Sequence, residues 1–356
     1  MFKLPRTIEW VEGKVRLINQ LLLPHRLEFI VTDDYKRVVE AIKRMEIRGA
    51  PAIGVAAAFA LALAASKFKG GGVGEAVKFL ERVGEELKSA RPTAFNLFWA
   101  VERVMKSVRR ASTVDDIKEL AVKEALAIAK EDEEVNRRIG EVGEHLIPDG
   151  GTVITVCNAG SLATVYYGTA TAPIYRAVER GKEVKVIVME TRPYLQGARL
   201  TALELKEAGI PVKIITDNAI GIVTLKERID MALVGADRIT KDGHVINKIG
   251  TYPLALVCME RGIPFYVAAP TSTVDPSTPI RDVVIERRPS DEVTYFMGKR
   301  IAPAGVEAIY YAFDITPPEL VTGLITERGI LRPPYERSIA RLFKSHKFQL
   351  QERAPR

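Results

Sequence analysis

Hydrophobic residues recur with a different period in the two halves of the chain. Between about residue 35 and residue 145 they return at the spacing of helices with one buried face. We therefore predict five helices, at residues 35–45, 52–66, 73–89, 96–109 and 114–138. The second of these is almost entirely Ala and Leu, which indicates a helix buried on most sides. Ahead of them, residues 7–22 resemble a small hairpin with Glu12 and Gly13 at its turn.

The second half alternates between short apolar runs and helical segments. The runs are rich in Val and Ile and predict strands at residues 152–156, 184–189, 212–216, 232–235 and 264–268. Helical patterns over residues 161–180 and 195–208 separate the first three strands. This alternation is typical of a parallel sheet covered by helices on both faces. We therefore predict an α/β protein with a small helical N-terminal domain at residues 1–130, a parallel-sheet domain at residues 131–336 and a tail at residues 337–356.

The composition is that of a globular protein from a reducing compartment. A chain of 356 residues suits about two domains. The longest apolar stretch, residues 49–65, is shorter than the ~20 residues of a membrane helix, and residues 1–10 lack the apolar core of a secretory signal. Because the only cysteines are Cys157 and Cys258, no disulfide framework is expected. We therefore expect a cytoplasmic protein that does not associate with a membrane.

Much of the net charge of +7 lies at the C-terminus. Residues 337–356 contain six Lys or Arg and one acid, Glu352, which leaves the rest of the chain near +2. A nearly neutral body argues against a nucleic-acid groove across the fold. The tail is expected to be solvated or partly helical, although its charge would also suit an acidic partner.

Polar residues follow directly after four of the predicted strands. They are Cys157, Asn158, Glu190, Thr191, Asp217, Asn218, Asp237 and Arg238. Because ligands of open parallel sheets lie outside the carboxyl ends of the strands, a thiol and three carboxyl groups are predicted to meet at one edge. The helix predicted after Cys157 would favour its thiolate, whereas apolar burial would favour its thiol, and the sequence leaves both open. Cys258 lies in a helical run and is expected to be an ordinary buried residue.

The sequence contains no motif for a nucleotide, metal or serine-hydrolase site. GxGxxG, GxxxxGK[ST] and GxSxG are missing, and the four histidines are scattered. We therefore expect no cofactor and no metal, which leaves acid–base chemistry, for which a cysteine and an aspartate are competent groups. Arg48 and Arg91 each precede a predicted helix, and Asn247 and Lys248 follow the Asp237 strand, so these residues could bind an anion.

Long motifs between residues 7 and 334 resemble those of the methylthioribose-1-phosphate isomerase family. They are Arg48-Gly-Ala-Pro-Ala-Ile-Gly54, Arg91-Pro-Thr-Ala-Phe-Asn-Leu97, Cys157-Asn-Ala-Gly160, Glu190-Thr-Arg-Pro193, Leu195-Gln-Gly-Ala-Arg-Leu200, Gly235-Ala-Asp-Arg238, Asn247-Lys-Ile-Gly250 and Ala312-Phe-Asp-Ile-Thr-Pro317. The family is related to the regulatory subunits of translation initiation factor 2B.

The resemblance implies a homodimeric enzyme with a helical N-terminal domain and a Rossmann-like C-terminal domain. Such enzymes convert 5-methylthio-α-D-ribose 1-phosphate to 5-methylthio-D-ribulose 1-phosphate in methionine salvage, with a sugar phosphate as the only ligand. The catalytic residues of the family fall on Cys157 and Asp237. The substrate contacts carried by matching motifs fall on Arg48, Gly49, Ala50, Arg91, Gln196, Asn247 and Lys248.

The chain departs from the family pattern at two places near these motifs. Val156 stands where the family usually has His, and Tyr310-Tyr311 stands where Asn-Pro is common. Two alternative functions remain: a ribose-1,5-bisphosphate isomerase, which would need further cationic groups, and a non-catalytic regulatory subunit of initiation factor 2B. Retention of both Cys157 and Asp237 favours catalysis. Whether the reaction proceeds through an enolate or a hydride shift is left open.

Overall fold

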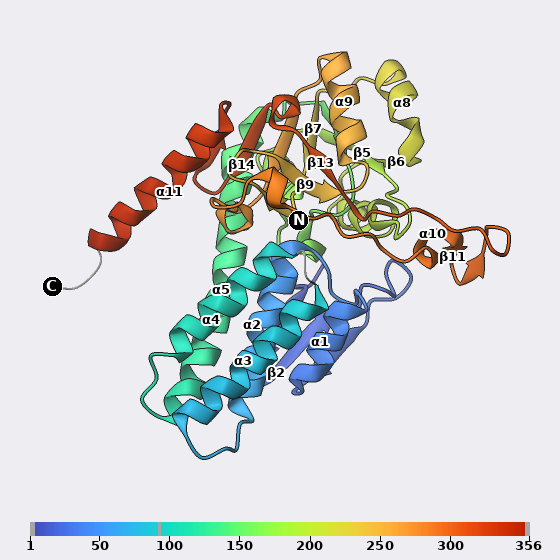
Figure 1. Ribbon diagram of the computed structural model, residues 1–356. Helices are drawn as coiled ribbons and strands as arrows, with labels where there is room; N and C mark the ends of the chain where they lie inside the picture. The colour runs from blue at the N-terminus through green and yellow to red at the C-terminus, as the bar shows by residue number, and fades with distance from the viewer. Residues whose placement is uncertain (1–3, 92–93, 353–356) are drawn as a thin grey trace.

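The computed structural model describes residues 4–91 and 94–352, with side chains to Lys344. It has two lobes, a helical N-terminal lobe and a C-terminal lobe built on a parallel sheet (Figure 1). The predicted α/β class, with a helical N-terminal domain and a Rossmann-like C-terminal domain, is confirmed.

A three-stranded antiparallel sheet flanks the helices of the N-terminal lobe. It consists of β1 (Ile8–Val11), β2 (Lys14–Ile18) and β3 (Phe29–Thr32) in that order. The predicted hairpin is confirmed, and its turn residues Glu12 and Gly13 both have positive φ, as a two-residue hairpin turn requires. The sequence analysis missed β3, an edge strand whose Phe29 and Val31 are exposed.

Five helices form the rest of this lobe and match the predicted helices closely. They are α1 (Tyr35–Lys43), α2 (Ala50–Ser66), α3 (Val73–Ala90), α4 (Phe95–Val108) and α5 (Val114–Gly143). Helix α2 is central, and every residue in it except Pro51 and Ser66 is buried. The run of small side chains lets α4 and α5 pack closely on α2, which explains its nearly uniform hydrophobicity.

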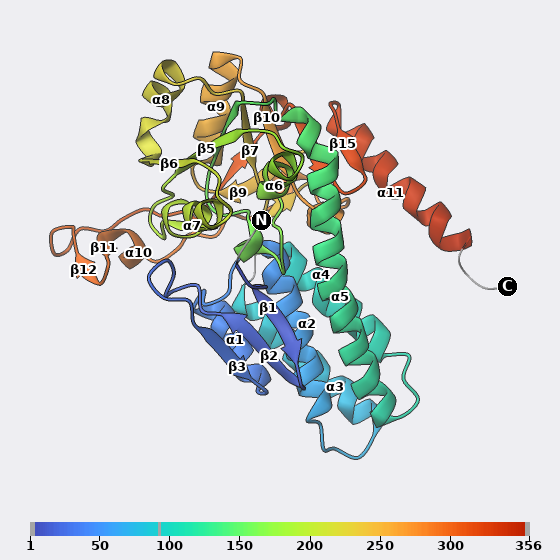
Figure 2. The same ribbon diagram turned by 180° about the vertical axis from the view of Figure 1, so that it is seen from behind.

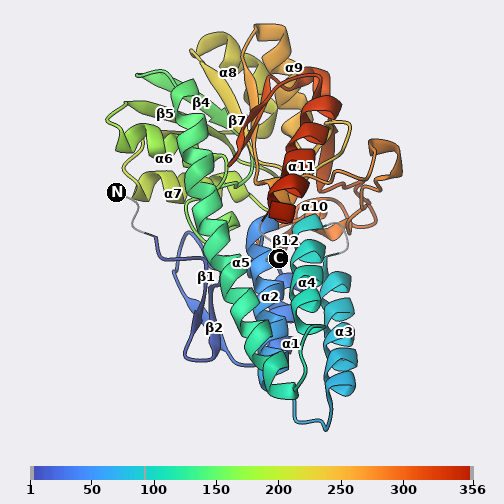
Figure 3. The same cartoon turned by 90° about the vertical axis from the view of Figure 1, so that its left-hand side faces the viewer.

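Helix α5 is longer than predicted and runs through both lobes (Figures 2 and 3). It starts at a capping box between Thr113 and Asp116, which satisfies the first N–H groups. It continues past residue 138 because Gly140 and Gly143 allow α6 (Thr171–Glu179) to approach closely. A Cβ at either glycine would lie within 2.9 Å of Ala172 O or 2.7 Å of Pro173 Cγ. The boundary we place at residue 130 falls inside this helix.

The C-terminal sheet has seven strands in the order β15-β14-β10-β7-β4-β5-β6. The strands are β4 (Gly151–Thr155), β5 (Val184–Met189), β6 (Val212–Ile215), β7 (Met231–Val234), β10 (Phe265–Ala268), β14 (Gly323–Thr326) and β15 (Gly329–Leu331). All pair in parallel except β15, which is antiparallel to β14. The five predicted strands are confirmed, and the β14–β15 edge was missed.

Helices cover both faces of this sheet, as its apolar strands predict. Helices α5, α6 and α7 (Ala202–Glu207) pack on one face. Helices α8 (Ile220–Lys226), α9 (Thr251–Arg261) and α11 (Tyr335–Glu352) pack on the other. Successive strand residues alternate between the two cores, for example Val153 with α6 and Ile154 with α9.

Smaller elements surround the C-terminal edge of the sheet. A second sheet contains β13 (Phe313–Thr316), β9 (Val245–Lys248) and β8 (Arg238–Ile239), and a protruding arm carries α10 (Asp291–Thr294), β11 (Tyr295–Phe296) and β12 (Lys299–Arg300). Single turns lie at Glu144–Leu146, Ser161–Ala163, Asp217–Ala219, Thr271–Thr273, Ile280–Asp282 and Pro318–Leu320. The π-helical segment Gly197–Thr201 continues directly into α7.

The basic tail begins inside α11, which projects from the sheet lobe (Figure 1). Ile339 and Leu342 are buried, so the first turns of this helix belong to the fold. The basic residues Arg353 and Arg356 lie outside the described residues. Among the helices that the structure describes, none has the length and apolarity needed to cross a bilayer.

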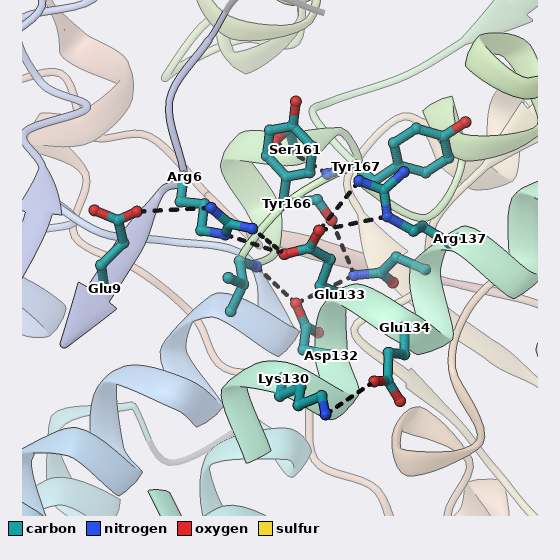
Figure 4. Close-up of polar contacts among 12 residues, drawn as sticks. Arg6, Glu9, Lys130, Asp132, Glu133, Glu134, Arg137, Ser161, Tyr166 and Tyr167 are labelled. Atoms are coloured by element: carbon teal, nitrogen blue, oxygen red, sulfur yellow. Dashed lines mark hydrogen bonds and ion pairs between the residues drawn. The ribbon is translucent and has the colours of Figure 1, made fainter. Parts of the chain in front are cut away.

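A network of charged residues joins the N-terminal segment, α5 and the loop after β4 (Figure 4). Glu133 on α5 accepts hydrogen bonds from Arg6 and Arg137, at 2.9–3.1 Å for the closest pairs. The neighbouring Asp132 accepts the backbone N–H of Val165 at 2.7 Å. Burial raises the pKa of Asp132 to about 7, against the hydrogen bond from Val165, which lowers it. Because Val165 lies in the segment after Cys157, the network ties α5 to the loop that carries the cysteine.

Candidate active site

Cys157 lies directly after β4 in a left-handed backbone conformation, with φ of 63°. Its N–H donates to Thr191 Oγ1 at 2.8 Å, and its carbonyl accepts from Thr201 Oγ1 at 2.6 Å. Thr191 also has a positive φ, 67°, which is rare for a β-branched residue. The Asp217 carboxylate holds it there by accepting the N–H groups of Thr191 and Arg192 at 2.8 and 2.7 Å. Strained backbone that its surroundings hold in place is common at functional sites.

Two expectations about this edge need correction. The helix predicted at residues 161–180 starts only at Thr171 and is preceded by a single turn, Ser161–Ala163. The helix that was expected to favour the Cys157 thiolate therefore does not begin at the cysteine, because the glycine-bounded loop folds back on itself before α6 starts. The carboxylate of Asp217 is occupied by backbone N–H groups rather than facing a ligand, and Glu190 lines none of the cavities described below.

Arg48 packs against the cysteine loop from the N-terminal lobe. Its Nη1 donates to Asn158 Oδ1 at 2.6 Å, and its Nη2 donates to Asn158 O at 2.9 Å and lies 4.0 Å from Cys157 Sγ. Gly49 makes this approach possible: it has φ of 95°, and a Cβ there would lie 2.4 Å from Ala163 Cα. The start of α2, with Gly49 and the buried Ala50, therefore rests on the loop after Cys157.

Asp237 and Lys248 both lie at the open end of the β8–β9 hairpin, Asp237 directly before β8 and Lys248 at the end of β9. The Asp237 N–H donates to Ile246 O at 2.9 Å, and Lys248 is buried at the end of β9. Burial raises the pKa of Asp237, while Lys248, Arg48 and Arg91 act to lower it. Burial likewise raises the pKa of Cys157, while Arg48 and Lys248 act to lower it. The two predicted catalytic groups thus share Arg48 and Lys248 as neighbouring cations.

Three adjoining cavities bring most of the predicted substrate contacts together. One, of about 420 Å³, is lined by Arg91, Ala94, Asp237, Arg238, Ile246, Asp282, Val283, Val284, Ile285, Glu286 and Phe313. A second shares Arg91, Glu286 and Phe313 with it and adds Met45, Tyr194, Lys248, Arg288, Tyr310 and Ala312. A third shares Met45 and Tyr194 with the second and adds Gln20, Leu21, Arg48, Gln196, Arg199 and Leu200.

The remaining predicted contacts do not line these three cavities. The Asn247 amide donates to Thr251 Oγ1 at 2.9 Å, so it stabilises the turn into α9. Gly49 and Ala50, which follow Arg48 in the sequence, line none of the three cavities. Pro92 and Thr93 of the Arg91 motif lie outside the described residues.

Three buried polar atoms around the cavities have no hydrogen-bond partner among the residues that the structure describes. They are Arg91 Nη1, Gln196 Oε1 and Tyr310 Oη. Buried polar atoms are nearly always paired, so this side of the site is suited to a polar ligand. Sequence reasoning marked Arg91 and Gln196 but not Tyr310, Tyr194 or Arg288. The only sequence signal for Tyr310 was its departure from the family motif.

Within the described part of the chain, no group of three or more His, Cys, Asp or Glu side chains is arranged to hold a metal ion. Cys258 is buried in the core between α9 and the sheet, and burial raises its pKa to about 12. Its location is that of an ordinary core residue.

Comparison with known proteins identifies relatives along nearly the whole chain. The model of the initiation factor 2 subunit family matches residues 46–333. A methylthioribose-1-phosphate isomerase of Thermosipho africanus is 50% identical over 95% of this chain and 98% of its own. A protein of Moorella thermoacetica named 5-deoxyribose 1-phosphate isomerase is 49% identical over 94% of this chain and 96% of its own.

Solved structures agree with these relatives. The crystal structure of 5-methylthioribose 1-phosphate isomerase from Pyrococcus horikoshii superposes with a TM-score of 0.88 at 45% identity and covers 97% of each chain. A structure described as translation initiation factor eIF-2B subunit delta from A. fulgidus gives a TM-score of 0.84 at 46% identity, with 96% of this chain and 100% of that chain covered.

Proposed function

The chain belongs to the initiation factor 2 subunit family and, within it, to the methylthioribose-1-phosphate isomerases, and we propose that Cys157 and Asp237 are its proton-transfer pair. Its reaction is the isomerisation of 5-methylthio-α-D-ribose 1-phosphate to 5-methylthio-D-ribulose 1-phosphate in methionine salvage. One observation carries the assignment of the pair: Cys157 and Asp237, from different strands, share Arg48 and Lys248 beside cavities with unpaired polar atoms.

The substrate determines which groups the site must supply. Phosphate on C1 prevents the ring from opening to a free aldehyde, so an acid must protonate the ring oxygen as the C1–O4 bond breaks. Hydrogen then leaves C2 and appears at C1, while the C2 hydroxyl loses its proton and becomes the ketone. In an enolate route a base removes the C2 proton, whereas in a hydride shift the base removes only the hydroxyl proton. Both routes therefore need one acid and one base.

The electrostatics favour Cys157 as the acid and Asp237 as the base. Burial keeps Cys157 a neutral thiol, which can donate a proton to the ring oxygen. Burial raises the pKa of Asp237, which makes its carboxylate a stronger proton acceptor, while Lys248, Arg48 and Arg91 act against that rise and favour the charged form. Arg48 and Lys248 would then stabilise the thiolate that remains after the transfer.

Arg91, Lys248 and Gln196 are the residues best placed to bind the phosphate and the sugar hydroxyls. Arg91 and Gln196 each offer an unpaired buried polar atom, and Lys248 is buried and lines the same cavity as Arg91. Arg48 retains N–H groups beyond those donated to Asn158 and can also contact the phosphate. Backbone N–H groups of Gly49 and Ala50 at the start of α2 suit the same anion.

The largest of the three cavities supports a methylthio group rather than a second phosphate at C5. Its wall is apolar along Ile246, Val283, Ile285 and Phe313. It also contains Asp282 and Glu286, which would repel an additional phosphate. Of its two cations, Arg238 is already paired with Asp275, and Arg91 is the one assigned above to the C1 phosphate. These features disfavour ribose 1,5-bisphosphate, and an apolar wall also accepts the smaller 5-deoxyribose 1-phosphate.

We also propose that the protein is a cytoplasmic homodimer. Support comes from exposed apolar side chains on α8 and α9, where Ile222, Leu225 and Met259 are each more than half exposed. Patches of this kind on a globular protein mark interaction surfaces. Light scattering on the purified chain measures the mass, and a monomer at micromolar concentration would reject the dimer.

Turnover by the purified protein tests the function directly. With 5-methylthioribose 1-phosphate the ketose should form without added metal or nucleotide, and ribose 1,5-bisphosphate should react at least ~100-fold more slowly in kcat/KM. Absence of turnover with either compound, combined with binding to a translation factor, would instead support the regulatory-subunit function. In deuterated water, label at C1 of the product would indicate the enolate route, and its absence the hydride shift.

A further inference from the structure

Glu204 on α7 is a fully buried carboxylate that contacts the cysteine loop and lines none of the three cavities. Its four hydrogen-bond donors are Asn158 Nδ2 at 2.9 Å, Leu162 N at 2.8 Å, Ser161 N at 2.7 Å and Tyr175 OH at 3.1 Å. The third residue after Cys157 must be a glycine for this approach, because a Cβ at Gly160 would lie 1.9 Å from Glu204 Oε2. The loop is therefore built around this one side chain.

The contact with Asn158 determines which way that amide faces. Asn158 Nδ2 donates to Glu204 Oε1 and also to Thr201 Oγ1 at 3.1 Å, so the amide nitrogen faces these two side chains. An ionised carboxylate can only accept hydrogen bonds, so it can pair with the nitrogen of the amide but not with the oxygen. The Asn158 oxygen is left to accept from Arg48, whose Nη2 lies 4.0 Å from Cys157 Sγ.

We propose that Glu204 is a positioning residue for the isomerisation, which acts through Asn158 to hold the Arg48 guanidinium beside the Cys157 thiol. The proposal rests on the role of Cys157 proposed above. Glu204 touches neither the thiol nor the cavities, so its effect on the reaction passes through the two intervening side chains. A guanidinium fixed at this distance favours the thiolate that Cys157 becomes when it donates its proton.

A purely structural role for Glu204 would have a different signature. The carboxylate also holds the N–H groups of Ser161 and Leu162, so its loss could simply loosen the loop. Loosening would lower stability and kcat without moving the pH at which the thiol ionises. The proposed role predicts that this pH moves upward, because Arg48 then keeps only its bond to the Asn158 carbonyl and is held less firmly beside the sulfur.

The experiment measures alkylation of Cys157 by iodoacetamide as a function of pH. A Cys258→Ser background leaves Cys157 as the only thiol. Glu204→Gln and Asn158→Ala should each raise the pH midpoint of the alkylation rate by up to about one unit, because Arg48 keeps its charge and its bond to the Asn158 carbonyl but is no longer fixed by Asn158 Oδ1. Tyr175→Phe removes a donor to Glu204 outside the proposed path and serves as the matched control, with no shift expected. In turnover, kcat of Glu204→Gln should fall by up to about 100-fold.

An unshifted midpoint in folded Glu204→Gln, or an equal shift in Tyr175→Phe, would overturn the proposal. If Glu204→Gln does not fold, Asn158→Ala tests the proposal in its place, because it interrupts the same path and leaves the bonds of Glu204 to Ser161 and Leu162 intact. An unshifted alkylation midpoint in Asn158→Ala would also overturn the proposal. Alkylation requires no turnover, so the result is separate from the proposed function. If Cys157→Ser retained activity, the catalytic assignment would fail while the alkylation shifts would still report on Glu204.

Discussion

Gly160→Ala isolates the close contact between the cysteine loop and Glu204. Gly160 has φ of −96°, which alanine adopts freely, so the substitution introduces no backbone strain of its own. The new Cβ would lie 1.9 Å from Glu204 Oε2 and 2.6 Å from its carboxyl carbon. An ordinary contact begins near 3.4 Å, so the carboxylate and the loop must separate by about 1.5 Å.

A displacement of that size breaks hydrogen bonds to the carboxylate. Loss of the two bonds at Oε2, from Ser161 N and Tyr175 OH, costs about 3–6 kcal/mol at 1.5–3 kcal/mol for each bond to a charged group. With an unfolding entropy of about 2.1 cal/mol/K per residue, this lowers Tm by roughly 4–8 °C for a chain of this length. Differential scanning calorimetry measures the shift.

The matched control is Gly74→Ala in α3. A Cβ there meets nothing within 4 Å, and alanine is the better helix former, so Tm should stay equal or rise by about 1 °C. If Gly160→Ala melted within 1 °C of the parent protein, the reasoning about the packing of Glu204 against the loop would be refuted.

Three further outcomes are expected. Cys157→Ser and Asp237→Asn should each lower kcat at least ~100-fold with little change in KM. Cys258→Ser should have almost no effect in the same steady-state assay. Normal turnover by the Cys157 or the Asp237 variant would reject the catalytic pair. Arg91→Ala should weaken substrate binding by about 1.5–3 kcal/mol in calorimetry, and unchanged affinity would exclude it from the phosphate site. Asp132 binds its proton more tightly in the folded state than in the unfolded state, so stability falls as pH rises from about 4 to about 7. The stability gain of Asp132→Asn should therefore grow by about 2.5 kcal/mol between pH 5 and pH 8 in chemical denaturation, and an equal gain at both values would contradict the burial of this carboxylate.

Periodicity predicted the elements whose burial pattern is regular. Helices α1 to α5 and strands β4, β5, β6, β7 and β10 were located within a few residues, because each has a continuous apolar face or a run of Val and Ile. The helix prediction for the segment after Cys157 was wrong for the opposite reason. Residues 161–170 are apolar and spaced like a helix, yet Gly160 and Gly168 and the donors to Glu204 hold them as an irregular loop.

The site was only partly visible in the sequence, for a related reason. Strand ends and motifs pointed to Cys157, Asp237 and Arg48, which the structure brings to neighbouring positions. The functions of Asp217 and Glu204 could not be read from their spacing, because each acts through backbone N–H groups contributed by a different segment. Tyr310 reaches the cavity from a long irregular stretch, where periodicity offers no guide.

The continuous helix α5 makes the two lobes one folding unit. Its first half contributes Ile117, Ala121 and Ala125 to the helical core, and its second half contributes Ile139 to the core beneath the sheet. Dissection of the chain at residue 130 would cut this helix and leave each fragment with an unfilled groove. The lobes should therefore melt in a single cooperative transition, and neither should fold when produced alone. Substrate would have to enter by movement of loops at the rim, because a 30-residue helix packed along its length is a poor hinge.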